Sequence, residues 1–179
     1  MPPEMRPELQ AFLQLMCWAE GTLREKEPYR TTYGYGHKIK SFSNHPALTG
    51  EWQGVRLKGE FCRKAGFKPG CRSTAAGAFQ ITKSTWQRLQ KKFSHLLPDF
   101  SPPSQDRAAC ILLLECGALA LLEKGEILPA IEKASRLWAS LPGSSSGQPQ
   151  RKMKNALLFF GGTLALLQKE KSLPPLGEA

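Results

Sequence analysis

Hydrophobic residues recur at helical spacing in five segments of the chain. In the first, residues 8–20, apolar side chains fall at Leu9, Phe12, Leu13 and Met16, and Gly21 follows where a helix C-cap is expected. The other four segments span residues 86–97, 101–123, 127–138 and 150–169. The last of these, 150–169, contains Gly161-Gly162, where we expect the helix to weaken. This pattern predicts a mainly helical body.

The stretch between the first two helical segments has a different texture. From residue 23 to residue 72, glycines alternate with aromatic and β-branched residues. That alternation is typical of short, irregular strands joined by long loops. We therefore expect one domain over residues 1–179, with a small β-rich lobe inserted after the first helix, a flexible loop at 143–149 and a mobile tail at 172–179.

The first helical segment ends on one acid, Glu20. Apolar neighbours such as Trp18 disfavour its charged form, and so does the negative end of the helix dipole. Both effects raise the pKa of Glu20 toward values at which a carboxylic acid can donate a proton near neutral pH. The alternative is an ordinary solvated glutamate at a helix end.

The net charge of +10 points to a polyanionic partner. Ten basic residues lie between Arg56 and Lys92, against Glu60 alone. This cluster contains no nucleic-acid-binding motif, so nucleic acid is not the expected partner. We find no secretory signal and no apolar run of membrane-spanning length, so we expect no stable membrane insertion. Cys62 and Cys71 flank a short loop and can pair in an oxidising compartment.

Other catalytic chemistry has little support. The three histidines form no HxxxH pair, no phosphate-binding glycine loop is present, and we expect neither a metal nor a cofactor. A hydrolytic glycosidase normally needs a second carboxylate. The candidates are Glu25, Glu27, Glu51 and Glu60, and no motif singles one out.

Four blocks in one order resemble the endolysins of lambda-like phages, which are lytic transglycosylases with a lysozyme-like α+β fold. The blocks are Trp18-Ala19-Glu20-Gly21-Thr22, Ser73-Thr74-Ala75-Ala76-Gly77-Ala78-Phe79-Gln80, Asp99-Phe100-Ser101-Pro102-Pro103-Ser104-Gln105-Asp106 and Leu137-Trp138-Ala139-Ser140-Leu141-Pro142-Gly143. The resemblance covers residues 9–165, and four collinear blocks make it specific.

The resemblance implies that Glu20 is the catalytic proton donor. It also implies that a Gly-x-aromatic-Gln element lines the substrate cleft. The expected substrate-binding residues are Ser73, Gly77, Phe79, Gln80, Trp138 and Tyr35. This chain departs from the family pattern in carrying Phe79 in place of Tyr and Ala78 in place of a basic residue. It also has extra residues between Pro46 and Ser73, including Trp52, Cys62 and Cys71.

The expected reaction cleaves the β-1,4 bond between N-acetylmuramic acid and N-acetylglucosamine in peptidoglycan and leaves 1,6-anhydro ends. The resemblance further implies a monomer made in the host cytoplasm and released to the periplasm by a phage holin. Two alternatives stay open. One is a hydrolytic muramidase that uses Glu25, Glu51 or Glu60, and the other is a non-enzymatic, basic glycan-binding domain.

Overall fold

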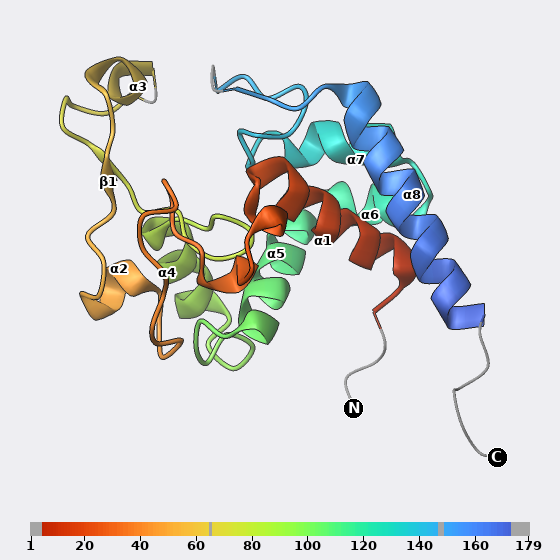
Figure 1. Cartoon of the computed structure of the whole chain (residues 1–179), viewed down its shortest axis with the longest axis horizontal. Helices are drawn as coiled ribbons and strands as arrows, with labels where there is room; N and C mark the ends of the chain where they lie inside the picture. The colour runs from red at the N-terminus through yellow and green to blue at the C-terminus, as the bar shows by residue number, and fades with distance from the viewer. Residues whose placement is uncertain (1–4, 65, 147–148, 173–179) are drawn as a thin grey trace.

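Five helices form the body of the protein in the computed structural model, which describes residues 5–64, 66–146 and 149–172 (Figure 1). Residues 173–179 of the expected tail and residues 147–148 of the expected loop lie outside the described residues. The helices are α1 (Pro7–Glu20), α5 (Pro102–Glu115), α6 (Ala118–Glu123), α7 (Ile127–Ala134) and α8 (Met153–Ser172).

Helix α1 runs through the core and packs along α8. Phe12, Leu15 and Met16 are fully buried, and the ring of Phe12 meets that of Phe160 edge to face at 6.4 Å. Gly21 ends the helix in the left-handed conformation, with φ of 80°. Helix α1 is therefore buried along its length and ends at Glu20, as the apolar spacing and Gly21 predicted.

Four predicted helical segments need correction. The segment 86–97 is helical only as far as Lys92, in α4 (Lys83–Lys92). The segment 101–123 is two helices, because Gly117 takes φ of 79° between α5 and α6. Helix α7 ends at Ala134, before Trp138. Helix α8 continues through Gly161-Gly162 without a break, because its inner face, with Ala156 and Phe160 buried, is held against α1.

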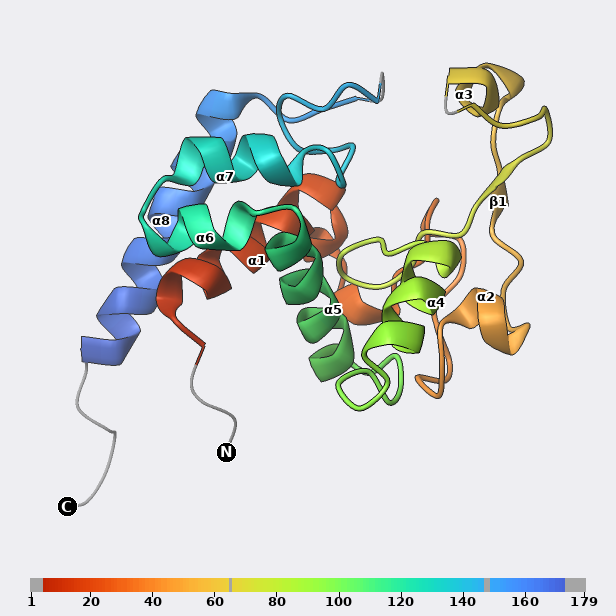
Figure 2. The same ribbon diagram turned by 180° about the vertical axis from the view of Figure 1, so that it is seen from behind.

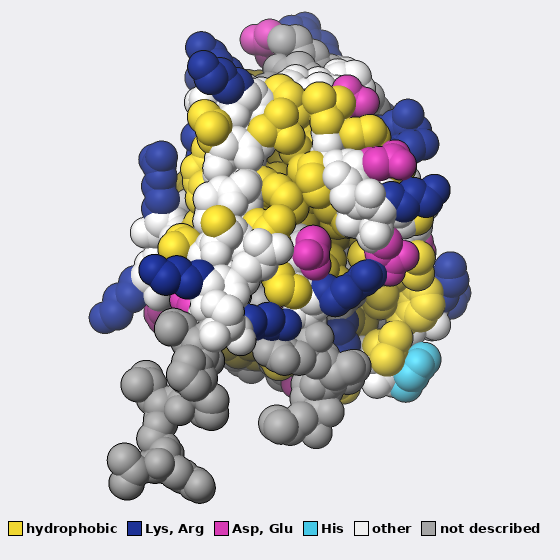
Figure 3. Space-filling model, turned by 90° about the vertical axis from the view of Figure 1, so that its right-hand side faces the viewer, with side chains coloured by type: hydrophobic (Ala, Val, Ile, Leu, Met, Phe, Trp, Pro, Cys, Tyr) yellow, Lys and Arg dark blue, Asp and Glu magenta, His cyan; other side chains and the backbone are white. Residues whose placement is uncertain are grey.

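The outer face of α8 carries two exposed leucines. Leu158 and Leu166 are about two-thirds exposed, and Figure 3 shows hydrophobic side chains gathered on this side of the molecule. Among the described helices, none is long and apolar enough to cross a membrane.

The lobe contains little regular strand. Its elements are η1 (Thr22–Arg24), η2 (Pro28–Arg30), α2 (Pro46–Thr49), β1 (Val55–Arg56), α3 (Gly59–Lys64) and β2 (Arg72–Ser73), and α4 (Lys83–Lys92) follows. The two strands pair antiparallel, with Val55 opposite Ser73. The α+β class is confirmed, with a lobe made mostly of loops and short helices.

Residues 54–73 form a projection that we call the finger. Strands β1 and β2 make its stem, and α3 lies at its tip, away from the helical body (Figure 2). Cys62 and Cys71 are joined by a disulfide, with their Cα atoms 5.8 Å apart.

Candidate active site

The Glu20 carboxyl lies at the end of α1 in a pocket of about 330 Å³. The pocket is lined by Glu20, Gly21, Arg24, Glu25, Tyr35 and Arg151. The hydroxyl of Ser140 donates a hydrogen bond of 2.6 Å to Glu20 Oε1. The Glu20 carboxyl is thus held in place by Ser140, 120 residues further along the chain, while it faces the pocket.

Burial raises the pKa of Glu20 to about 7. The hydrogen bond from Ser140 and the positive charge of Arg151 both lower it, but neither outweighs the loss of hydration. A group with this pKa is about half protonated at neutral pH. Glu20 can therefore give up a proton and take one back under the same conditions.

Ser140 and Arg151 are site residues that our reading of the sequence missed. The guanidinium of Arg151 lies 4.7 Å from the centre of the Trp18 ring and donates a 3.0 Å hydrogen bond to the Trp18 carbonyl. Its backbone N–H donates to the carbonyl of Ser140 at 2.9 Å. Together these contacts fasten the segment after α7 to the end of α1. Ser140 stands in one of the four blocks that resemble endolysins, whereas no local pattern marks Arg151.

Tyr35 lies in the same pocket as Glu20. Its hydroxyl donates a 2.9 Å hydrogen bond to the backbone carbonyl of Glu20, and its side chain is about half exposed. A Cβ atom on Gly21 would lie only 2.7 Å from the Tyr35 hydroxyl. Glycine therefore serves at position 21 both for its left-handed backbone and for this close approach.

Two predicted aromatic residues are buried instead. Phe79 is 1% exposed and packs edge to face against Tyr29. Trp138 is 5% exposed, and its indole N–H donates to the Phe79 carbonyl at 2.9 Å. Any contact of Phe79 with a substrate must therefore use its backbone, and the substrate-binding roles of both residues stay predictions.

The other predicted residues lie around the turn that precedes α4. Gly77 has φ of 78°, and a Cβ atom there would meet Gln105 Oε1 at 2.1 Å. The side-chain amide of Gln80 donates to the Gly77 carbonyl at 2.9 Å. Gln80 and Trp138 line a second pocket of about 260 Å³. Ser73 lies on β2. Gly77 therefore allows the close approach of Gln105. The substrate contacts of Ser73, Gly77 and Gln80 remain predictions.

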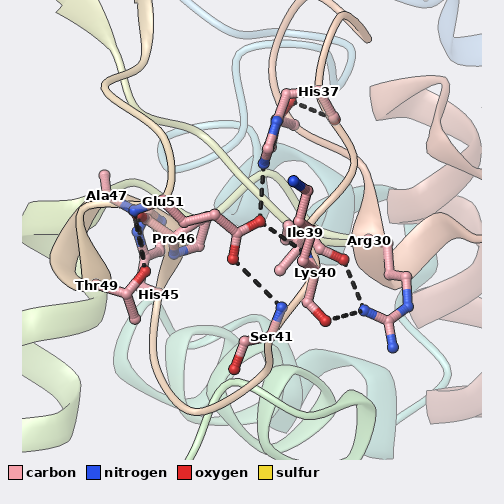
Figure 4. A network of polar contacts seen from close by, with 11 residues as sticks. Arg30, His37, Ile39, Lys40, Ser41, His45, Pro46, Ala47, Thr49 and Glu51 are labelled. Carbon is pink, nitrogen blue, oxygen red and sulfur yellow. Dashed lines mark hydrogen bonds and ion pairs between the residues drawn. The ribbon is translucent and has the colours of Figure 1, made fainter.

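The candidate second acids are placed very differently from one another. Glu51 accepts hydrogen bonds from His37 Nε2 at 2.8 Å and from the backbone N–H groups of Lys40 and Ser41 (Figure 4). These donors lower the pKa of Glu51 although its partial burial acts in the opposite direction. Glu51 therefore holds the lobe together.

The remaining acids are also accounted for. Glu27 pairs with Arg30 at 3.3 Å, and Glu60 lies on α3 in the finger. Glu25 lines the same pocket as Glu20 and forms an ion pair of 2.6 Å with Lys38. Of the four candidate second acids, Glu25 alone lines the Glu20 pocket.

A helical body, an inserted lobe and one acid at the end of a buried helix define a lysozyme-like protein. The family model for endolysins matches residues 10–164, and the chain belongs to the endolysin family. It is 32% identical to the endolysin of Escherichia phage lambda over 169 residues, which is 90% of this chain and 96% of that protein. It is also 32% identical to the endolysin of Escherichia phage P2 over 150 residues, with 84% and 88% covered.

Solved structures agree with this assignment. The lysozyme of bacteriophage lambda in complex with a chitohexasaccharide matches with a TM-score of 0.72 and 30% identity, over 90% of this chain and 96% of that one. A second structure of lambda lysozyme matches with a TM-score of 0.64 and 27% identity, over 93% and 96%. The lysozyme-like fold and the resemblance to lambda-type endolysins are thus confirmed.

Proposed function

We propose that this endolysin cleaves the glycan strands of bacterial peptidoglycan as a lytic transglycosylase, with Glu20 as its acid and base. Protonated Glu20 gives its proton to the glycosidic oxygen, and the bond from that oxygen to the muramyl C1 breaks as an oxocarbenium-like state develops. The Glu20 carboxylate then takes the proton of the muramyl C6 hydroxyl, whose oxygen bonds to C1. The products are a new hydroxyl on the leaving sugar and a 1,6-anhydromuramic end, and no water is consumed.

The placement of Glu20 is the observation that carries this proposal: its carboxyl lies at the end of α1, is held by Ser140, faces a pocket and has a pKa of about 7. One carboxyl must act first as an acid and then as a base, and a pKa near the working pH suits both steps. The attacking hydroxyl belongs to the substrate, so no second carboxylate has to activate water. The glycan in one lambda lysozyme structure supports a sugar polymer as the substrate class.

A hydrolytic muramidase is the second candidate, and the place of Glu25 in the Glu20 pocket favours it. In that reaction Glu25 would serve as base or nucleophile, and water would end up on the muramyl C1. Its ion pair of 2.6 Å with Lys38 engages one of its two carboxylate oxygens. We rank this mechanism second for that reason.

The products and two matched variants decide between the mechanisms. Mass spectrometry of purified peptidoglycan after digestion should show anhydromuramic ends, each one water lighter than a reducing end. Glu20→Gln should lower turnover by about 100- to 10,000-fold. Glu25→Gln should keep most of the activity. Reducing muramic ends as the main product, with an equal loss in Glu25→Gln, would establish the hydrolase instead.

A further inference from the structure

The finger is a rigid projection built on a fixed base. The guanidinium of Arg72 donates hydrogen bonds to the carbonyls of Gln53 at 2.7 Å and Gly54 at 2.6 Å. A Cβ atom on Gly54 would lie 2.5 Å from the Ser73 carbonyl oxygen, so the two sides of the stem are in close contact. These contacts give the stem a set direction away from the lobe.

The tip of the finger is closed on itself. Cys62 is fully buried and bonded to Cys71, and the Phe67 N–H donates to the Cys62 carbonyl at 2.8 Å. The Leu57 N–H donates to the Cys71 carbonyl at 2.9 Å. This small, cross-linked unit nevertheless leaves Phe67 63% exposed and Phe61 37% exposed. An exposed aromatic side chain on a fixed loop is a typical feature of a binding surface.

The finger is also strongly basic. Residues 54–73 contain six Lys or Arg and one acid, Glu60. Five of the cations are solvent-exposed around the tip and stem: Arg56, Lys58, Arg63, Lys68 and Arg72. An apolar centre surrounded by cations is complementary to a ligand that carries carboxylates beside apolar groups.

Helix α1, which carries Glu20 at its carboxyl end, ends on the side of the helical body that faces the finger (Figures 1 and 2). The loop after α7, which supplies Ser140 to the pocket, lies along the same edge of the molecule as α3. A long polymer seated at Glu20 and extending along that edge runs toward the finger.

We propose that the finger binds the acidic peptides attached to the muramyl residues of the glycan strand. This inference rests on the proposed function, because it assigns a second contact to the same substrate. The cations of the finger bind the peptide carboxylates, and Phe67 packs on the apolar parts of the same peptide. The finger therefore makes the enzyme prefer peptide-bearing glycan over bare glycan.

The test measures binding in a Glu20→Gln background, so that turnover does not consume the ligand. The finger variant is Arg63→Glu/Lys68→Glu. A matched control, Lys124→Glu/Lys169→Glu, makes the same charge change at exposed positions on the far side of the helical body. The ligands are soluble glycan strands released from purified sacculi by an endopeptidase that cuts the peptide cross-links, and the same strands after an amidase has removed the peptides. Fluorescence anisotropy of end-labelled strands gives the affinity for each.

We expect the finger variant to bind the peptide-bearing strands about tenfold more weakly, because two cations become carboxylates that repel the peptide carboxylates. Its affinity for the peptide-free strands should equal that of the control. Phe67→Ala, which keeps every charge, should also weaken binding to the peptide-bearing strands only. Thiol titration should find three free cysteines (Cys17, Cys110, Cys116) in every variant, which verifies that the finger disulfide is intact.

Two results would overturn the inference. One is equal binding of the peptide-bearing strands by the finger variant and the control, and the other is an equal loss of affinity for the peptide-free strands. Failure of the proposed reaction is seen separately, because it shows in the products of the unmodified enzyme and not in these affinities.

Discussion

Replacing Ser140 by alanine should raise the pH at which the enzyme loses activity. The Ser140 hydroxyl donates its hydrogen bond to Glu20 Oε1 at 2.6 Å, and a donor favours the ionised carboxylate. Removing the donor therefore destabilises the ionised form and raises the pKa of Glu20 above its present value of about 7. The acid form then persists to higher pH.

The size of the shift follows from the strength of such a bond. A hydrogen bond to a charged group contributes about 1.5–3 kcal/mol, and one pKa unit corresponds to about 1.4 kcal/mol. Water in the vacated space recovers part of the interaction, so we take about one unit, to a pKa near 8. At pH 8 the protonated fraction of Glu20 then rises from about one-tenth to about one-half.

Tyr35 also lines the pocket. Burial raises the pKa of Tyr35 above its ordinary value, so its phenol remains neutral over this pH range. We therefore assign the change on the alkaline side to Glu20.

The assay is kcat/KM for solubilisation of purified peptidoglycan between pH 5 and pH 9. We expect the alkaline limb to move up by about one unit, and the plateau at low pH to fall because the carboxyl is held less firmly. Ser135→Ala is the matched control, since the Ser135 hydroxyl donates to the Glu132 carbonyl and not to Glu20. An alkaline limb that stays in place or moves down would refute the reasoning.

Two further predictions concern stability. Folding raises the pKa of Glu20 from 4.5 to about 7, so Glu20 lowers the stability of the fold increasingly as the pH rises through that interval. Glu20→Gln should therefore raise Tm at pH 8 but not at pH 4, and an equal change of Tm at both pH values would contradict this. Gly77→Ala forces a Cβ against Gln105 Oε1 and strains a backbone at φ of 78°, so urea denaturation should show a loss of about 2–4 kcal/mol; a loss below about 1 kcal/mol would mean that the turn relaxes easily.

Local sequence patterns predicted the body of the fold well where one face of a helix is buried. The spacing of Leu9, Phe12, Leu13 and Met16 located α1, and Gly21 located its end. The same approach missed the break at Gly117, because the apolar run from Ala108 to Leu122 continues across it. It also expected weakness at Gly161-Gly162, where packing of α8 on α1 outweighs the low helix propensity of glycine.

The candidate site was predictable only in part. Glu20 could be found because the cause of its acidity, the end of a buried helix, is local in sequence. Ser140 approaches from 120 residues away, and Arg151 makes its contact with Trp18 across 133 residues. Neither hydrophobic periodicity nor motif spacing predicts contacts between residues so far apart in sequence. Phe79 illustrates the opposite case, since its motif suggested a cleft residue while the packing of Tyr29 and Trp138 encloses it.

The segment from Ser140 to Arg151 both positions Glu20 and sets its acidity. Burial alone would push the pKa of Glu20 higher, and the two influences that oppose it come from the ends of this one segment. Arg151 fastens the segment to α1 through the ring and carbonyl of Trp18, and its N–H holds the carbonyl of Ser140. The contacts of Arg151 with Trp18 and with the Ser140 carbonyl therefore place both Ser140 and Arg151 beside Glu20. The pKa of about 7 is therefore the balance between the burial of Glu20 and the two groups that this segment brings to the end of α1.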